Sequence, residues 1–335
     1  MTHDRWTLAQ EAGVLPPVHG PLLALMPRAE AELEMLAAPD QVTAVQGFKP
    51  DHDRLAARGF ATALTPEGKY GAALVQIVKS KPGTLSAIAE ALVHLAPGGL
   101  LLVDGAKEEG IESVLKALKG VLPVDDVYSK AHGKLIWLTR PDHLPEALMD
   151  WIAEPAEIEG GYITAPGGFS VDGPDRGSEI LVALLPQLSG RVADLGAGWG
   201  YVAAEVLAEH EGIEILDLIE ADHPMLEAAK ANIDDPRARF HWADAALFKP
   251  DAPYDVVLSN PPFHTGRRAD PGLGRAFIQA AARLLTPRGR FFMVANRHLP
   301  YEPALKDAFT TGRLMGELEG YKLYEASKPR RQTRA

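Results

Sequence analysis

The chain has 335 residues, enough for two domains that each bury a core of their own. Hydrophobic residues make up 46% and charged residues 24% of the sequence, a balance typical of a folded globular protein rather than a disordered one. The sequence contains no cysteine, which excludes disulfides and thiolate metal sites. The formal net charge of -11 argues against a uniformly basic surface, so a nucleic-acid partner would need a local basic patch.

The N-terminal sequence lacks the apolar stretch of a secretory signal, and no apolar run reaches the ~18 residues of a membrane span. We therefore expect a cytoplasmic protein with no membrane partner. The histidines show neither the H-x-x-x-H nor the H-E-x-x-H spacing of metal ligands, so no metal site is expected.

Segments of the first half resemble segments of the second half in the same order and at nearly constant spacing. The matching pairs are YGAALVQIVKSK (70–81) with YDVVLSNPPFHT (254–265), LAPGGLLLVDGAK (95–107) with LTPRGRFFMVANR (285–297), and HGKLIWLTR (132–140) with EGYKLYEAS (319–327). This pattern predicts an internal duplication. Because the two copies lie within one chain, we expect the protein to be a monomer.

The repeating unit is predicted to alternate strands with helices. In the second half, short apolar runs bounded by glycine or acidic residues predict strands at RVADLG, IEILDLIEA, PYDVVLSN, RFFMVA and YKLYEA. HPMLEAAKANI and GRAFIQAAARLL carry apolar residues three and four apart, which predicts helices. The Pro/Gly-rich stretch 154–169 is the natural boundary between halves. The prediction is an α/β protein with two tandem Rossmann-like domains, 1–155 and 156–335, each with a mostly parallel sheet.

A glycine-rich loop follows the first strand of the second half. VADLGAGWG has a D-x-G-x-G-x-G spacing, and its expected ligand-binding residues are Asp194, Gly196, Ala197, Gly198 and Gly200. Glycines let the backbone turn tightly and bring a ligand against main-chain amides near a helix N-terminus. A carboxylate at the strand end suits an ammonium group and would repel a pyrophosphate. The loop therefore favours S-adenosylmethionine as cofactor over a dinucleotide.

Acidic residues also follow the next two predicted strands. Glu220 could accept hydrogen bonds from the hydroxyls of a ribose, and Asp244, with Ala245 beside it, could bind the adenine. Ligands in such sheets bind outside the carboxyl ends of the strands. The order of glycine loop, acid and acid on successive strands predicts one cofactor site.

The motif NPPF follows the fourth strand of this half and indicates the chemistry. Two consecutive prolines hold a rigid turn that fixes the Asn260 side chain and the Pro261 carbonyl, two acceptors for one amino group. Phe263, after Pro262, offers a flat face for stacking a planar base or amide. Accepting both amine hydrogens favours a pyramidal nitrogen whose lone pair can attack a sulfonium methyl. We interpret these four residues as catalytic and the protein as an N-methyltransferase.

Together these motifs resemble the bacterial ribosomal RNA guanine-N2 methyltransferases, most closely the small-subunit methyltransferase C group. The resemblance is carried by DLGAGWG, SNPPFH, VANRHLPYE, EGYKLYEA and PGGFSVDGPDRGSEIL. It implies that the second half methylates the N2 amine of a guanine in 16S rRNA, with ribosomal RNA or a ribosomal subunit as partner. It also implies a degenerate methyltransferase-like first domain that docks the RNA or is structural. The first half has QIVKSKP where the second has LSNPPFH, and it has no D-x-G-x-G-x-G.

Other substrates and another class of enzyme remain open at this point. The large-subunit guanine-N2 enzymes share NPPFH, and adenine N6 and protein glutamine N-methyltransferases also use NPP with an aromatic residue. A nicotinamide oxidoreductase is the alternative from a different class, because dinucleotides bind similar loops. Basic residues that could contact RNA, or could be ordinary solvated charges, are Arg267, Arg268, Arg275, Lys328, Arg330, Arg331 and Arg334.

Overall fold

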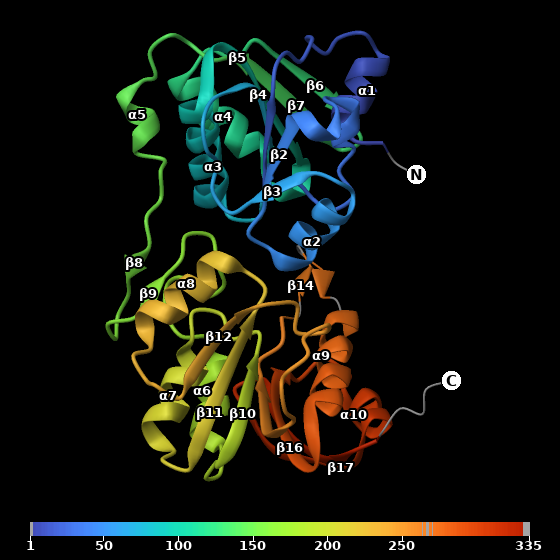
Figure 1. The fold of residues 1–335 in the computed structure, drawn as a ribbon, viewed down its shortest axis with the longest axis vertical. Coiled ribbons are helices and arrows are strands. Elements are labelled where there is room, and N and C mark those ends of the chain that lie inside the picture. The colour runs from blue at the N-terminus through green and yellow to red at the C-terminus, as the bar shows by residue number, and fades with distance from the viewer. Residues whose placement is uncertain (1–2, 263, 266–267, 270, 331–335) are drawn as a thin grey trace. The chain divides into compact units, whose positions relative to one another are not determined.

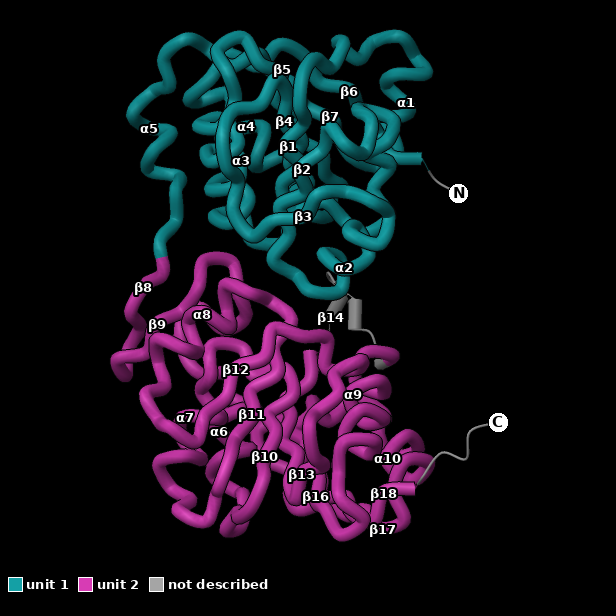
Figure 2. The backbone as a smooth tube through the Cα atoms, viewed as in Figure 1, with its two compact units in different colours: residues 1–154 teal, residues 155–335 magenta. Residues whose placement is uncertain are grey.

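The computed structural model describes residues 3–262, 264–265, 268–269 and 271–330 (Figure 1). The chain divides into two compact units, Met1–Glu154 and Pro155–Ala335, which Figure 2 shows in teal and magenta. Each unit is built around one large sheet flanked by helices (Figure 1). In the part of the chain that the structure describes, no helix combines the length and the apolar character that a membrane span requires.

In the first unit, the described strands form a seven-stranded sheet in the order β3-β2-β1-β4-β5-β7-β6. Its strands are β1 (Leu22–Leu25), β2 (Val42–Val45), β3 (Ala61–Ala63), β4 (Tyr70–Gln76), β5 (Leu95–Ala106), β6 (Asp126–Lys130) and β7 (Gly133–Thr139). Its helices are α1 (Arg5–Glu11), α2 (Lys49–Ala57), α3 (Lys81–His94), α4 (Ile111–Val121) and α5 (Glu146–Met149), with short 3-10 turns at Leu33–Met35, Pro39–Gln41 and Lys107–Glu109.

In the second unit, the described strands form a seven-stranded sheet in the order β12-β11-β10-β13-β16-β18-β17. Its strands are β10 (Gly190–Leu195), β11 (Ile213–Glu220), β12 (Ala238–Trp242), β13 (Tyr254–Ser259), β16 (Leu285–Asn296), β17 (Phe309–Leu318) and β18 (Tyr321–Pro329). The helices are α6 (Arg176–Leu184), α7 (Tyr201–Glu209), α8 (His223–Asn232), α9 (Pro271–Leu284) and α10 (Glu302–Ala308). Two short pairs complete it: β8 (Ala156–Glu157) with β9 (Ile163–Thr164), and β14 (His264–Thr265) with β15 (Arg268–Ala269).

Central strands of the second sheet contain continuous apolar runs because both of their faces are covered. In β13, Val257 belongs to one buried cluster, whereas its neighbours Val256 and Leu258 belong to another. Phe291 and Phe292 of β16 divide between the same two clusters. Successive side chains of a strand point to opposite faces, so these runs place one core on each side of the sheet.

The two sheets repeat one topology. Counted within each unit, both strand orders read 3-2-1-4-5-7-6, with the last two strands antiparallel to their neighbours. β5 and β16 have the same length and the same sequence of buried and exposed positions. The predicted pair of Rossmann-like sheets is confirmed, and the strands and helices expected in the second half are present.

Candidate active site

The glycine-rich loop connects β10 to α7 and adopts backbone conformations that favour glycine. Gly196, Gly198 and Gly200 have φ angles of 74°, 57° and 90°. A Cβ on Gly200 would lie 2.9 Å from Cδ1 of Ile233 and 3.1 Å from Cβ of Ala229, so a side chain there would have to displace neighbours at the end of α8. The loop therefore brings its backbone to the carboxyl edge of the sheet, where a ligand can approach the main-chain amides.

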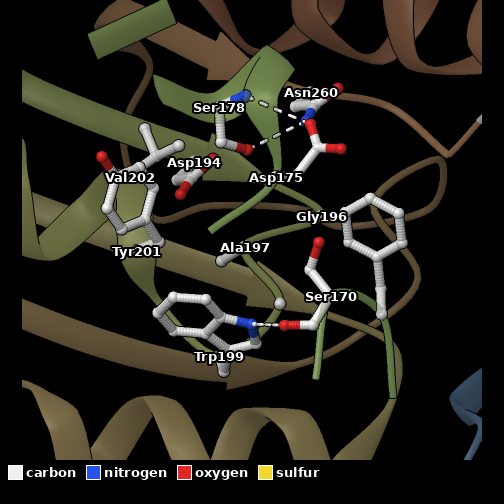
Figure 3. A pocket seen from close by; sticks show the side chains of 12 residues that line it. Ser170, Asp175, Ser178, Asp194, Gly196, Ala197, Trp199, Tyr201, Val202 and Asn260 are labelled. Atoms are coloured by element: carbon white, nitrogen blue, oxygen red, sulfur yellow. Dashed lines mark hydrogen bonds between the residues drawn. The ribbon is translucent and has the colours of Figure 1, made fainter. Parts of the chain in front are cut away.

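Asp194 is a buried carboxylate at the end of β10, and it lines the pocket shown in Figure 3. Its side chain is 2% exposed, and its Oδ2 has no hydrogen-bond partner among the described residues. Burial, and after it the nearby charge of Glu220, raises the pKa of Asp194 to about 7. Binding a cationic partner would be favourable for this carboxylate, because a charge-assisted hydrogen bond would offset the hydration that the carboxylate loses on burial.

Glu220, at the end of β11, is hydrogen-bonded to the glycine loop. Its Oε2 accepts from the amide of Gly198 at 2.8 Å, and its Oε1 accepts from the amide of Asp222 at 2.8 Å. Burial raises the pKa of Glu220, although these two amide contacts act in the opposite direction. A carboxylate offers about four acceptor positions, so about two remain for a ligand.

Asp244 and Ala245 follow β12 at the same edge of the sheet. The amide of Ala243 donates to the carbonyl of Glu220 at 2.9 Å, which continues the β11–β12 pairing beyond the strand end. The Asp244 side chain accepts from the amide of Ala246 at 2.8 Å and is half-buried. Ala245 is 5% exposed and packs within a hydrophobic core cluster. The pocket in Figure 3 brings together the loop, Asp194 and Asn260, but not Glu220 or Asp244.

Asn260 follows β13 and lines the pocket beside Asp175 and Ser178 (Figure 3). Its Nδ2 donates to Oδ2 of Asp175 at 2.8 Å and to Oγ of Ser178 at 2.9 Å. Its Oδ1 is buried and has no hydrogen-bond partner among the described residues. Pro261 is buried and Pro262 is exposed, whereas Phe263 lies outside the described residues. Within the described part of the chain, the site thus contains a second buried acceptor without a donor.

Several pocket residues were not singled out from the sequence. They are Phe169, Ser170, Asp175, Ser178, Trp199, Tyr201 and Val202. The indole Nε1 of Trp199 donates to the carbonyl of Ser170 at 3.2 Å, which ties the segment before α6 to the glycine loop (Figure 3). Asp175 and Ser178 begin α6, and in sequence they are ordinary helix-capping residues. Of the basic residues considered as candidate RNA contacts, Arg267, Arg331 and Arg334 lie outside the described residues, and Arg275 is exposed on α9.

The fold and the site define a class, the Rossmann-like methyltransferases. The sequence model of the methyltransferase small domain matches residues 159–325. A ribosomal RNA small subunit methyltransferase C from Shewanella oneidensis is 32% identical over 79% of this chain and 79% of its own length. One from Psychromonas ingrahamii is 30% identical over 77% of this chain and 76% of its own length. The chain belongs to the ribosomal RNA small subunit methyltransferase C family, as the resemblance predicted.

A solved structure shares the fold over both units. A T. thermophilus 16S rRNA N2 methyltransferase in complex with AdoMet and guanosine superposes with a TM-score of 0.79. It is 23% identical in sequence, and the match covers 94% of this chain and 89% of that chain. The likeness extends the fold assignment to the first unit, which the methyltransferase small domain does not include.

Proposed function

We propose that this chain transfers a methyl group from S-adenosylmethionine to the N2 amine of a guanine in 16S rRNA. The observation that carries the proposal is the Oδ1 of Asn260, a buried acceptor that has no partner among the described residues and lines the same pocket as the glycine loop. The family membership supports a small-subunit rRNA substrate. The guanosine named with the related solved structure supports the base. Such a substrate would place the enzyme in the cytoplasm.

The residues assigned to the cofactor suit S-adenosylmethionine in charge. Asp194 supplies a buried carboxylate for the ammonium. The glycine loop supplies main-chain amides that can approach the ligand closely, at Gly196, Ala197, Gly198 and Gly200. We assign the ribose to Glu220 and the adenine to Asp244 and Ala245. Bound S-adenosylmethionine supplies an electrophilic methyl group on a sulfonium. The chain orients this group and contributes no covalent intermediate, so its residues act by positioning and charge placement.

The catalytic residues hold the amine. Asn260 Oδ1 and the carbonyl of Pro261 each accept one of its hydrogens, while Phe263 stacks on the base. A guanine amine is a weak nucleophile because its lone pair is delocalised into the ring. Holding both hydrogens on one side favours a pyramidal nitrogen with a localised lone pair. A neutral asparagine suits this site because the positive charge of the sulfonium disappears on transfer.

Transfer of labelled methyl to purified substrates tests this function. The protein is incubated with labelled S-adenosylmethionine and, separately, with 16S rRNA, small subunits, 23S rRNA and a release factor. Label on guanine N2 in 16S rRNA or small subunits is expected. Label only on 23S rRNA, on adenine N6 or on protein would replace the proposed substrate by one of the alternatives. Binding of NAD without S-adenosylmethionine would favour an oxidoreductase.

The first unit retains the start of the loop, where the chain leaves the strand, without the ligand-binding groups of the second unit. The amide of Met26 donates to the carbonyl of Val45 at 2.9 Å, and in the second unit the amide of Gly196 donates to the carbonyl of Ile219 at 2.9 Å. Met26 therefore stands where the second unit has Gly196, and its φ of 54° is also positive. The shared register makes Ala24 the counterpart of Asp194, so the carboxylate for an ammonium is missing.

The same register makes Gln76 the counterpart of Asn260. Its side-chain oxygen already accepts from the amide of Arg28 at 2.8 Å, whereas Asn260 Oδ1 has no partner among the described residues. We infer that the first unit binds no S-adenosylmethionine. Calorimetric titration is expected to give one cofactor per chain, and two sites per chain would contradict the inference. Sedimentation of the same sample tests the further proposal that the protein is a monomer.

A basic hollow on the first unit supports a docking role for that unit. It lies at the β6–β7 turn, and its lining includes Lys107, Lys130, His132 and Lys134. Lys107, Lys130 and His132 are exposed. The Nζ of Lys134 lies 3.4 Å from Oε1 of Glu112. Because the whole chain is acidic, a local concentration of cations is what an RNA backbone would require. We assign this hollow to rRNA phosphates.

Replacing Lys107, Lys130 and Lys134 by glutamate is expected to weaken RNA binding. Each lost phosphate contact should lower the slope of log Kd against log salt by about 0.7–0.9. If each lysine makes one such contact, the slope for the triple variant should be lower by about 2–3. A charge-matched control places the same change at the exposed Lys119, Lys249 and Lys306. Equal slopes for the two variants would show that net charge, rather than this hollow, governs binding.

A further inference from the structure

The side-chain amide of Asn260 has a required orientation in the proposed reaction. Its oxygen accepts an amine hydrogen, whereas its NH2 group would meet that amine as a second donor. A half-turn of the amide exchanges the two ends and leaves the shape of the side chain nearly unchanged. The backbone turn of Pro261 and Pro262 places Asn260, but it does not choose between these two orientations.

Two side chains of α6 make that choice. Asp175 Oδ2 accepts from Asn260 Nδ2 at 2.8 Å, and Ser178 Oγ accepts at 2.9 Å, so both amide hydrogens are used (Figure 3). An ionised carboxylate can only accept hydrogen bonds. The opposite orientation would set Asn260 Oδ1 against the oxygen of Asp175 and lose a charge-assisted hydrogen bond. The oxygen of Asn260 is therefore left as the end that is available to a ligand.

Asp175 is itself held rigidly. Its Oδ2 also accepts from the amides of Gly177 at 2.8 Å and Ser178 at 3.2 Å, which makes it the N-cap of the nine-residue helix α6. A Cβ on Gly177 would lie 2.9 Å from Cε1 of Tyr321 in β18, so this end of the helix packs directly on the sheet. The orientation of Asn260 is thus fixed by a structured element, 85 residues away in sequence for Asp175.

We propose that Asp175 and Ser178 are positioning residues that hold Asn260 Oδ1 toward the substrate amine. This inference rests on the proposed function, because it explains how the acceptor in that reaction is oriented. It assigns to the start of α6 a part in catalysis that its capping sequence does not reveal.

The test uses substitutions that keep the helix capped. Serine is about as good an N-cap as aspartate, but it is too short to reach Asn260. The double variant Asp175→Ser, Ser178→Ala is expected to lower kcat about 10- to 100-fold, the scale of a slightly misplaced reacting group. The Kd for S-adenosylmethionine and the unfolding temperature should change little. The single variant Asp175→Asn keeps a capping oxygen in the same place and should retain most of the wild-type kcat.

A mutant cycle separates positioning from a general structural role. In an Asn260→Ala background, the double substitution should have almost no further effect on kcat, because the group that it orients is absent. Arg176→Ala is a matched control within the same helix turn, since Arg176 pairs with Glu179 and Glu319 rather than with Asn260. It should leave kcat unchanged.

The outcomes distinguish this inference from the proposed function. If Asn260→Ala is nearly inactive while the double variant has full kcat, the function stands and the positioning role is wrong. If the double substitution lowers kcat equally in both backgrounds, its effect is structural and the positioning role is again wrong. If Asn260→Ala itself keeps full activity, the proposed chemistry fails first, and nothing remains for α6 to orient.

Discussion

Replacing Asn260 by alanine is expected to lower kcat for methyl transfer about 10²- to 10³-fold, the loss found when one preorganised hydrogen bond to a reacting group is removed. The substitution deletes the buried Oδ1, for which the described part of the chain supplies no donor, and leaves the main chain of the Asn-Pro-Pro turn in place. The Kd for S-adenosylmethionine should change by no more than a few fold, because the glycine loop and Asp194 remain. Single-turnover kinetics and calorimetry on the same sample measure both quantities.

A second strand-end asparagine provides the control. Asn296 ends β16, and its Oδ1 accepts from the amide of His298 at 3.1 Å, so it already has a partner. Asn296→Ala should change stability slightly and leave kcat near the wild-type value. Full turnover by Asn260→Ala with the cofactor bound would mean that the amine is activated by some other group.

Replacing Asp194 by asparagine is expected to weaken binding of S-adenosylmethionine about 10- to 100-fold at pH 8. The change keeps the shape of the side chain and removes the charge that would meet the ammonium, and hydrogen bonds to charged groups contribute about 1.5–3 kcal/mol. Calorimetry at several pH values measures the effect. Unchanged affinity at pH 8 would show that the methionyl group does not lie against Asp194.

The pH dependence of this binding has a definite sign. The raised pKa of Asp194, about 7, means that the folded protein favours the neutral carboxyl. The neutral carboxyl of Asp194 therefore adds to the free energy of unfolding at acid pH, and this stabilisation is lost as the pH rises through about 7. An ammonium ligand favours the ionised form, so affinity should rise with pH through about 7 and then level off. Asp194→Asn should flatten this profile.

Asp217 is the matched control for Asp194. Both aspartates are 2% exposed in neighbouring strands, but Asp217 accepts from Tyr254 Oη at 2.8 Å and lies 2.6 Å from His241 Nε2. These contacts hold the pKa of Asp217 below its usual value. Asp217→Asn should therefore reduce stability, because it disturbs a satisfied buried network, while the pH profile of cofactor binding keeps its shape.

Much of the fold could be predicted because its signals are local. Continuous apolar runs such as β13 and β16 indicate strands covered on both faces, and the repeated segments predicted two sheets of one kind. The strand β17 was not predicted. Seven of its ten residues are exposed, so it carries no apolar alternation, and it exists because it pairs along β18 at the sheet edge.

The parts of the candidate site that could be predicted are those where the backbone conformation nearly requires one residue type. The glycine spacing and the paired prolines indicated a tight loop and a rigid turn without knowledge of any contact. The partners of Asn260 were not predictable, because Asp175 and Ser178 are 85 and 82 residues away and resemble ordinary caps. The hydrogen bonds of Glu220 to the loop were missed for a similar reason, since they depend on how two strand ends meet.

The first unit also bears on what a tight turn at the end of a strand reveals about ligands. There, Gln46 binds its own loop as Glu220 does in the second unit. Its Nε2 donates to the carbonyl of Pro27, and its Oε1 accepts from the amide of Phe48, both at 2.8 Å. The turn keeps its left-handed residue although methionine is costlier there than glycine. The left-handed residue thus belongs to the turn that ends the strand, and the chemistry comes from the side chains around that turn.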